Sequence, residues 1–225
     1  MVDNAGKSHV VGAEIEATWS VTDNLVLSAA YGWSRNELDE YFDTTLAGLN
    51  CNTFGWEGYT SSRPYSGDVT DEEIEARCVA AGDASGQRAP RVAEHTANIV
   101  ANYERGISAD LGWFFRTDLN FESKKYATVA NLAHTGNMYI WNARVGLDTH
   151  RRTASLYVDN ILDDDTVALI TDFPTINESL YQRFDPAVKT RWFEDRGGSV
   201  NPTSFQLTPR RGRSVGILLQ ARFGN

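Results

Sequence analysis

Apolar and polar residues alternate with a period of two along most of the chain. Between Val11 and Trp19 the odd positions are apolar, and the even positions are Gly, Glu, Glu and Thr. Because successive side chains of a strand point to opposite faces, this pattern predicts a strand with one apolar and one polar face. The pattern recurs six more times. The predicted strands lie near residues 9–20, 25–36, 91–103, 108–121, 138–148, 153–161 and 210–223.

The two predicted faces differ sharply in charge. None of the apolar-face positions is Asp, Glu, Lys or Arg. The opposite faces carry Glu14, Glu16, Glu94, Asp110, Arg116, Asp118 and Arg144. Most of these strands are at least as long as a tilted membrane-spanning strand, which needs about 9–11 residues. Strands of soluble sandwiches have about 5–6 residues.

The connections between the predicted strands alternate between short and long. Residues 22–24, 104–107 and 148–152 form the short ones, and residues 37–90, 122–137 and 163–208 form the long ones. This alternation is typical of outer-membrane barrels. Aromatic residues at the ends of the apolar rows suit the two membrane interfaces. We therefore predict an all-β, antiparallel, up-and-down transmembrane barrel portion, with a soluble β-sandwich as the alternative, since its strands alternate as well.

Composition excludes several other classes. The 30 acidic and 21 basic residues argue against a nucleic-acid partner, which would require a basic surface. Two cysteines exclude a disulfide-dense scaffold, and the four histidines lie on separate segments without metal-ligand spacing. The carboxylates form no catalytic pair, and no nucleophile elbow is present. We predict no enzyme, no metal and no cofactor.

Four segments resemble the C-terminal barrel of TonB-dependent outer-membrane receptors, in the order found in that family. They are 11–17 with 25–32, 89–103, 156–163 (which is similar to a V-x-N-L-x-D strand) and the final 209–223. The resemblance covers nearly the whole chain. It implies about seven strands of a larger, 22-stranded barrel with long extracellular loops and short periplasmic turns. On this resemblance, residues 1–225 are the C-terminal part of such a barrel, without its plug domain.

The resemblance also implies a function and a location. A receptor of this family takes up a scarce large solute, such as a ferric siderophore, a cobalamin or an oligosaccharide, with TonB-coupled energy. The implied location is the outer membrane of a Gram-negative bacterium. The implied partners are membrane lipid, the missing plug and barrel strands, the TonB complex and the barrel-insertion machinery. A passive porin or adhesin-type barrel and a soluble β-sandwich binding module are the alternatives.

Candidate site residues lie in the long loops and in the last strand. Aromatic rings can stack on a flat ligand and Arg can clamp a carboxylate. The ligand-binding candidates are Trp56, Tyr59, Arg63, Tyr65, Tyr181, Arg183, Arg191 and Trp192, with ordinary loop packing as the alternative. Cys51 and Cys78 are expected to form a disulfide, because an external loop is oxidising; two free thiols are the alternative. The alternating row Val215, Ile217, Leu219 and Phe223 resembles the signal read by the insertion machinery.

Overall fold

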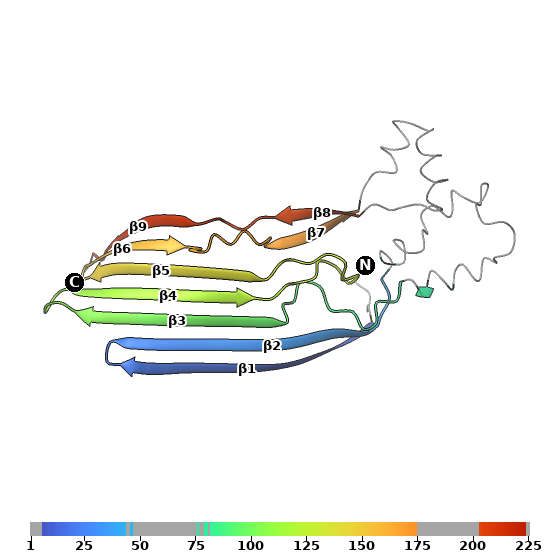
Figure 1. Ribbon diagram of the computed structural model, residues 1–225, viewed down its shortest axis with the longest axis horizontal. Helices are drawn as coiled ribbons and strands as arrows, with labels where there is room; N and C mark the ends of the chain where they lie inside the picture. Colours follow the sequence, from blue (N-terminus) through green and yellow to red (C-terminus); the bar gives the residue numbers. More distant parts are fainter. Residues whose placement is uncertain are drawn as a thin grey trace, which may run out of the picture.

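Seven strands form one antiparallel sheet in a computed structural model that describes residues 6–43, 46, 76, 79–80, 82–174 and 203–223. The strand order is β1-β2-β3-β4-β5-β6-β9, so neighbours in the sheet follow one another along the chain except between β6 and β9 (Figure 1). The strands are β1 Gly6–Thr22, β2 Leu25–Tyr41, β3 His95–Gly106, β4 Gly112–Glu122, β5 Met138–Asp148, β6 Arg152–Asp159 and β9 Ser214–Ala221. This confirms the predicted all-β antiparallel sheet of about seven strands.

The pairing register brings the apolar rows of all seven strands to the same face of the sheet. A slip of one residue in any pair would move that strand's apolar row to the opposite face. The cross-strand partners include Ile15 with Tyr31, Ala97 with Phe121, Phe115 with Val145 and Leu156 with Ile217. We call this side the apolar face and the other side the polar face.

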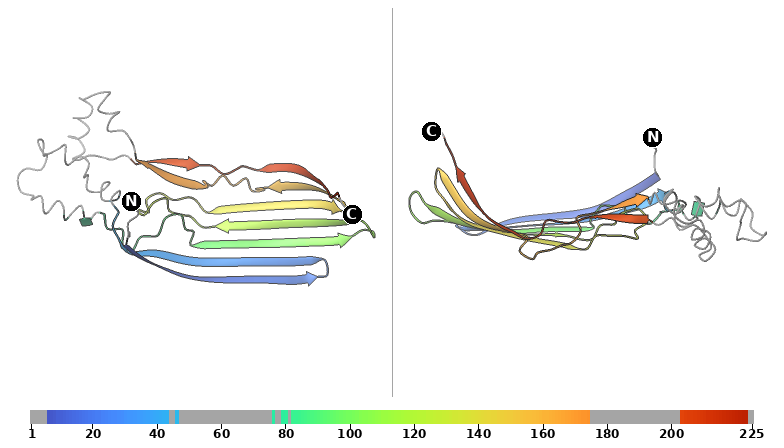
Figure 2. Two further views of the ribbon diagram at one scale, coloured as in Figure 1. Left: turned by 180° about the vertical axis from the view of Figure 1, so that it is seen from behind. Right: turned by 90° about the horizontal axis from the view of Figure 1, so that it is seen from above.

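In the part of the chain that the structure describes, nothing covers the apolar face. Ile15, Trp19 and Ile217 are 66%, 64% and 68% exposed, respectively. Seen edge-on, the sheet is one bent layer (Figure 2). A soluble sandwich requires a second layer over these rows, and the described part of the chain contains none. The buried apolar cluster of Leu38, Leu46 and Ala84 lies instead beyond the apolar rows, at one end of the sheet.

Short turns close one end of the sheet, which we call the turn end; the opposite end is the loop end (Figure 1). In the first turn the Thr22 hydroxyl accepts hydrogen bonds from the amides of Asn24 (3.2 Å) and Leu25 (3.0 Å). Between β3 and β4 the amides of Ile107 and Ser108 donate to the Leu111 carbonyl. Consequently β4 begins at Gly112 rather than near residue 108.

One hairpin lies within the segment that the sequence predicted as the loop 163–208. Strands β7 Leu169–Pro174 and β8 Thr203–Thr208 pair antiparallel in a separate two-stranded sheet. They lie beyond the ends of β6 and β9, on the loop side (Figure 1). Both strands are short, and many residues separate them along the chain, so alternation alone does not reveal them. No helix in the described ranges is long and apolar enough to span a membrane.

Candidate functional site

A continuous row of hydrogen-bonded side chains crosses β3, β4 and β5 on the polar face. Asn98 donates to Asn120 (2.7 Å), and Asn120 and Asn142 both donate to one oxygen of Asp118 (2.9 and 2.8 Å). We call these four residues the amide row. Asn98 lies directly opposite Asn120, and Asp118 directly opposite Asn142. Because a carboxamide has two donors and two acceptor positions, the row keeps hydrogen-bonding capacity for a polar partner.

The polar face is hollowed near the turn end. A hollow of about 850 Å³ is lined by residues of β3, β4, β5 and their turns. Among the lining residues are Asn102, Phe114, Arg116, Arg144 and Asp148. Phe114 lies over Gly146, where an added Cβ would come within 2.6 Å of the ring. The surface of the hollow therefore combines guanidinium and carboxylate groups with an aromatic ring and an amide.

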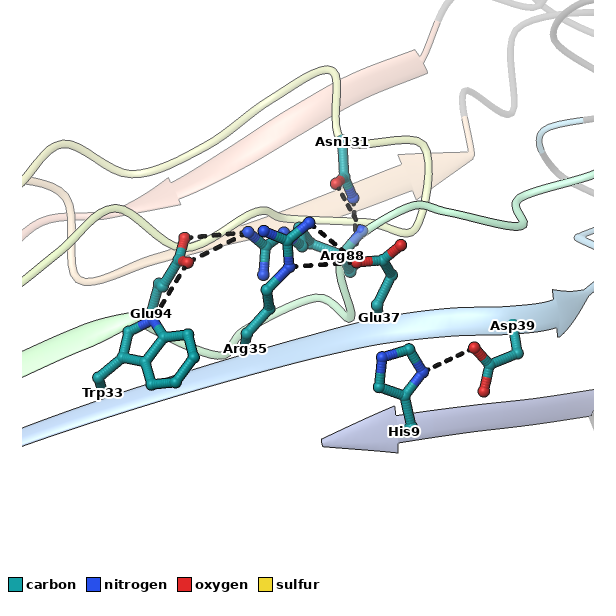
Figure 3. Close-up of polar contacts among 8 residues, drawn as sticks. All are labelled: His9, Trp33, Arg35, Glu37, Asp39, Arg88, Glu94 and Asn131. Carbon is teal, nitrogen blue, oxygen red and sulfur yellow. Dashed lines mark hydrogen bonds and ion pairs between the residues drawn. The ribbon is translucent and has the colours of Figure 1, made fainter. Parts of the chain in front are cut away.

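A second polar cluster lies at the loop end, just before β3 (Figure 3). Arg88 donates to both carboxylate oxygens of Glu94 (3.2 and 3.1 Å), and the Trp33 indole N–H donates to the same carboxylate (3.4 Å). The Asn131 side chain accepts from the Arg88 amide and donates to the Arg88 carbonyl, both at 2.9 Å. This cluster ties the segment before β3 to β2 and to the β4–β5 connection.

Charged side chains begin on the apolar side of β2 where its apolar row ends. Trp33 is the last apolar residue of the row, and Arg35, Glu37 and Asp39 follow at the same alternation. Arg35 donates to Glu37 at 3.2 and 3.1 Å, and His9 lies 2.6 Å from Asp39 (Figure 3). The change from apolar to charged residues marks the loop-end boundary of the apolar face.

Asn160 and Asp164 connect the segment after β6 to the start of β5 and to the segment before β9. Asn160 is buried at a φ of 55°, and its side chain donates to the carbonyls of Asp164 (3.0 Å) and Arg211 (3.3 Å). Asp164 accepts from the amides of Tyr139 (2.7 Å) and Thr166 (2.8 Å). Partial burial raises the pKa of Asp164, but the hydrogen bonds from Thr166 and Tyr139 outweigh it, so the net pKa is lowered.

Some polar groups on the apolar face are hydrogen-bonded to one another. The Trp141 indole N–H donates to the Thr117 hydroxyl (2.6 Å), which in turn donates to the Asn142 carbonyl (2.8 Å). Aromatic pairs lie toward both ends of the apolar rows. Their ring centroids are 5.0 Å apart in both Tyr103–Trp113, near the turn end, and Phe121–Tyr139, toward the loop end.

The structure tests only part of the predicted site. The ligand-binding candidates Trp56, Tyr59, Arg63, Tyr65, Tyr181, Arg183, Arg191 and Trp192 lie outside the described residues, as do Cys51 and Cys78. Val215, Ile217 and Leu219 lie on the outer side of β9 and are strongly exposed, as is Phe223 beyond its end. Within the described ranges, β9 pairs with β6 on one side only.

The charged residues that the sequence places opposite the apolar rows separate into two groups. Glu14, Glu16, Arg116, Asp118 and Arg144 belong to strands and share the polar face. Asp110 lies in the β3–β4 turn, where its carboxylate is 3.7 Å from His150, and Glu94 precedes β3. The roles of Arg88 and Asn131 were not predicted, because contacts between separate loops leave no periodic signal.

Comparisons with known proteins place this fold. A family model described as "TonB dependent receptor-like, beta-barrel" matches residues 1–161. The ferric yersiniabactin uptake receptor FyuA from Yersinia pestis is similar over 98% of this chain and 24% of its own, with 18% identity and a TM-score of 0.61. The siderophore receptor PiuA from Acinetobacter baumannii is similar over 95% and 22%, with 17% identity and a TM-score of 0.53. The chain thus spans about a quarter of these receptors' length. A search of curated proteins found no match.

Proposed function

Since the chain belongs to the TonB-dependent receptor β-barrel family, whose barrels lie in the outer membrane of Gram-negative bacteria, we propose that it forms part of the wall of an active transport receptor. In this arrangement the apolar face contacts lipid and the polar face lines the lumen. The short turns face the periplasm and the long loops the outside. The rest of the wall and a plug domain complete the receptor.

The height of the apolar face is the observation that carries this proposal. Its outward rows contain no charged residue and extend over residues 11–19, 25–33, 113–121 and 139–147. Each matches the roughly 9–11 residues that a tilted strand needs to cross a bilayer. Aromatic pairs lie toward both ends of the rows, and charged residues follow at the loop end, as expected at two lipid interfaces. A hydrocarbon layer accounts for both the height and the exposure.

The transported solute is proposed to be scarce and too large for a passive pore. A ferric siderophore is favoured over a cobalamin or an oligosaccharide, because one similar solved structure is described as a ferric yersiniabactin uptake receptor and another as a siderophore receptor. Energy would reach the receptor through the TonB complex. The amide row supplies hydrogen-bonding groups to whatever enters the lumen, and it keeps that wall hydrated when nothing does.

The loop residues and the last strand complete the proposal. Aromatic and Arg residues of loops 37–90 and 163–208 would contact the solute, and a Cys51–Cys78 disulfide would close the first loop. Closing a loop of that length stabilises a protein by roughly 3–4 kcal/mol in the chain-entropy model. The outward row Val215, Ile217 and Leu219, with Phe223 after it, would be read by the insertion machinery.

Transport by the full-length protein tests this function. Uptake of a panel of labelled ferric siderophores is measured in cells with and without TonB, with membrane fractions separated to locate the protein. The proposal expects outer-membrane protein and uptake that stops without TonB. Uptake that persists without TonB indicates a passive porin, and protein extracted in buffer without detergent indicates a soluble binding module. Replacing Arg183 and Arg191 together by Gln should weaken solute affinity; unchanged affinity removes them from the site.

A further inference from the structure

Two arginines lie directly opposite each other on the polar face. Arg116 of β4 and Arg144 of β5 are cross-strand partners in the register, and both are exposed. Side chains in such a pair start about 5 Å apart, and like charges there are destabilising. A wall built only for stability would place an acid or an amide at one of the two positions, as the next pair, Asp118 and Asn142, does.

Neutral groups hold both guanidinium groups in place. Arg116 donates to the Asn102 side chain at 3.3 Å, and the Arg144 guanidinium carbon lies 6.0 Å from the centre of the Tyr157 ring. Neither arginine forms an ion pair with any described residue of the chain. A guanidinium has five N–H donors, so most of the donors of this pair remain for another acceptor.

The support beneath Arg144 depends on a glycine. Tyr157 lies across Gly216, where an added Cβ would come within 2.5 Å of the phenolic oxygen. Arg144 of β5, Tyr157 of β6 and Gly216 of β9 are successive register partners across the sheet. Gly216 thus leaves room for the Tyr157 ring, and Tyr157 places the guanidinium.

The surrounding hollow separates the charges. Arg116 and Arg144 lie within β4 and β5. Asp23 and Asp110 line the same hollow from turns, and Glu104 lines it from the last residues of β3. Asp148 also lines it and is hydrogen-bonded to the Thr153 hydroxyl. Asp118, which lies two residues from Arg116 on the polar face of β4, already accepts from two amides. Among the described residues, none of these acids forms an ion pair with Arg116 or Arg144.

We infer that Arg116 and Arg144 form a binding site for a carboxylate group on the lumen side of the wall, near the turn end. A planar carboxylate between two guanidinium groups accepts charge-assisted hydrogen bonds from both, and its negative charge offsets their mutual repulsion. The inference rests on the proposed function only in that the polar face must line a lumen. The carboxylate comes either from a dissolved solute or from an acidic side chain of the polypeptide that fills the lumen.

Thermal unfolding of the full-length protein in detergent tests the inference. The variants are R116Q/R144Q, the charge-preserving R116K/R144K, and R151Q as a matched control in the β5–β6 turn. Each is measured at low salt, with increasing citrate and with sodium chloride of equal ionic strength. The electrophoretic migration of unheated samples in detergent gels shows whether each variant has folded. TonB-dependent uptake, measured in parallel, separates failure of this inference from failure of the proposed function.

Two outcomes support the site and identify the source of the carboxylate. If the carboxylate is dissolved, citrate but not chloride raises the melting temperature of the native protein, and R116Q/R144Q weakens the apparent citrate affinity at least about tenfold. If the carboxylate belongs to the polypeptide, the melting temperature of R116Q/R144Q is lower than those of the native protein and of R151Q. Citrate then leaves the melting temperatures of the native protein and of R116Q/R144Q unchanged. R116K/R144K recovers part of the lost melting temperature. If R116Q/R144Q melts at or above the native protein and citrate has no effect, the pair is merely repulsive and the inference is wrong.

Discussion

The two faces of the sheet satisfy their polar groups in different ways. On the polar face Glu14 and Glu16 are exposed, and the amide row combines bonds within the wall with spare capacity. On the apolar face the polar groups of Tyr31 and His95 pair with each other at 2.8 Å, and those of Thr117 and Trp141 also pair. Groups that face water need no fixed partner, whereas groups that face hydrocarbon do. The Tyr31–His95 and Thr117–Trp141 pairs therefore fit an apolar face that meets hydrocarbon.

Two neighbouring positions on β3 provide the strongest test of whether the two faces meet different solvents. Ile99 lies on the apolar face and is 54% exposed, whereas Val100 lies on the polar face opposite Asp118. An arginine facing lipid near the bilayer midplane costs about 2–4 kcal/mol. We therefore expect I99R to lower the free energy of unfolding in lipid vesicles by about that amount, measured by urea titration.

The control is V100R, which places the same charge one residue away and on the other face. Its guanidinium meets Asp118 across the strands, so we expect a change of less than about 1 kcal/mol. Equal losses for I99R and V100R would mean that hydrocarbon does not lie against the apolar face.

The Trp141–Thr117 bond allows a finer test. Replacing Thr117 by Val removes the acceptor of the indole N–H without changing the side-chain volume much. In hydrocarbon the N–H finds no water, so we expect T117V to lose about 1–3 kcal/mol of unfolding free energy. On the polar face Thr18 and Ser28 share a 3.2 Å hydrogen bond that water can replace, so T18V should cost less. Similar losses in vesicle unfolding would contradict the assignment of the faces.

Alternation predicted the assignment of residues to faces because it is a local property. Ile99 and Val100 lie on opposite faces of the sheet whatever residues pair with them across the strands. The short turns then determine which consecutive strands pair. Contacts between segments far apart in sequence could not be predicted this way. The β7–β8 hairpin pairs residues 169–174 with 203–208, and Asn131 reaches Arg88 across two connections. The arginine pair could be assigned to the polar face, but its direct opposition depends on the β4–β5 register.

The smallest effect is expected outside the strands, at Asp164. Its pKa is lowered in the folded protein, so the ionised carboxylate favours the folded state. That stabilisation is complete above the ordinary pKa of about 4, and it is lost as the pH falls through the lower pKa of the folded state. D164N should therefore reduce the loss of stability below about pH 4, measured by acid titration of unfolding. D165N, at an exposed neighbour, is the control. The Asp164 carboxylate accepts hydrogen bonds from the amides of Tyr139 and Thr166. If D164N shows the same dependence of stability on pH as the native protein, the strength of these bonds does not depend on the charge of Asp164.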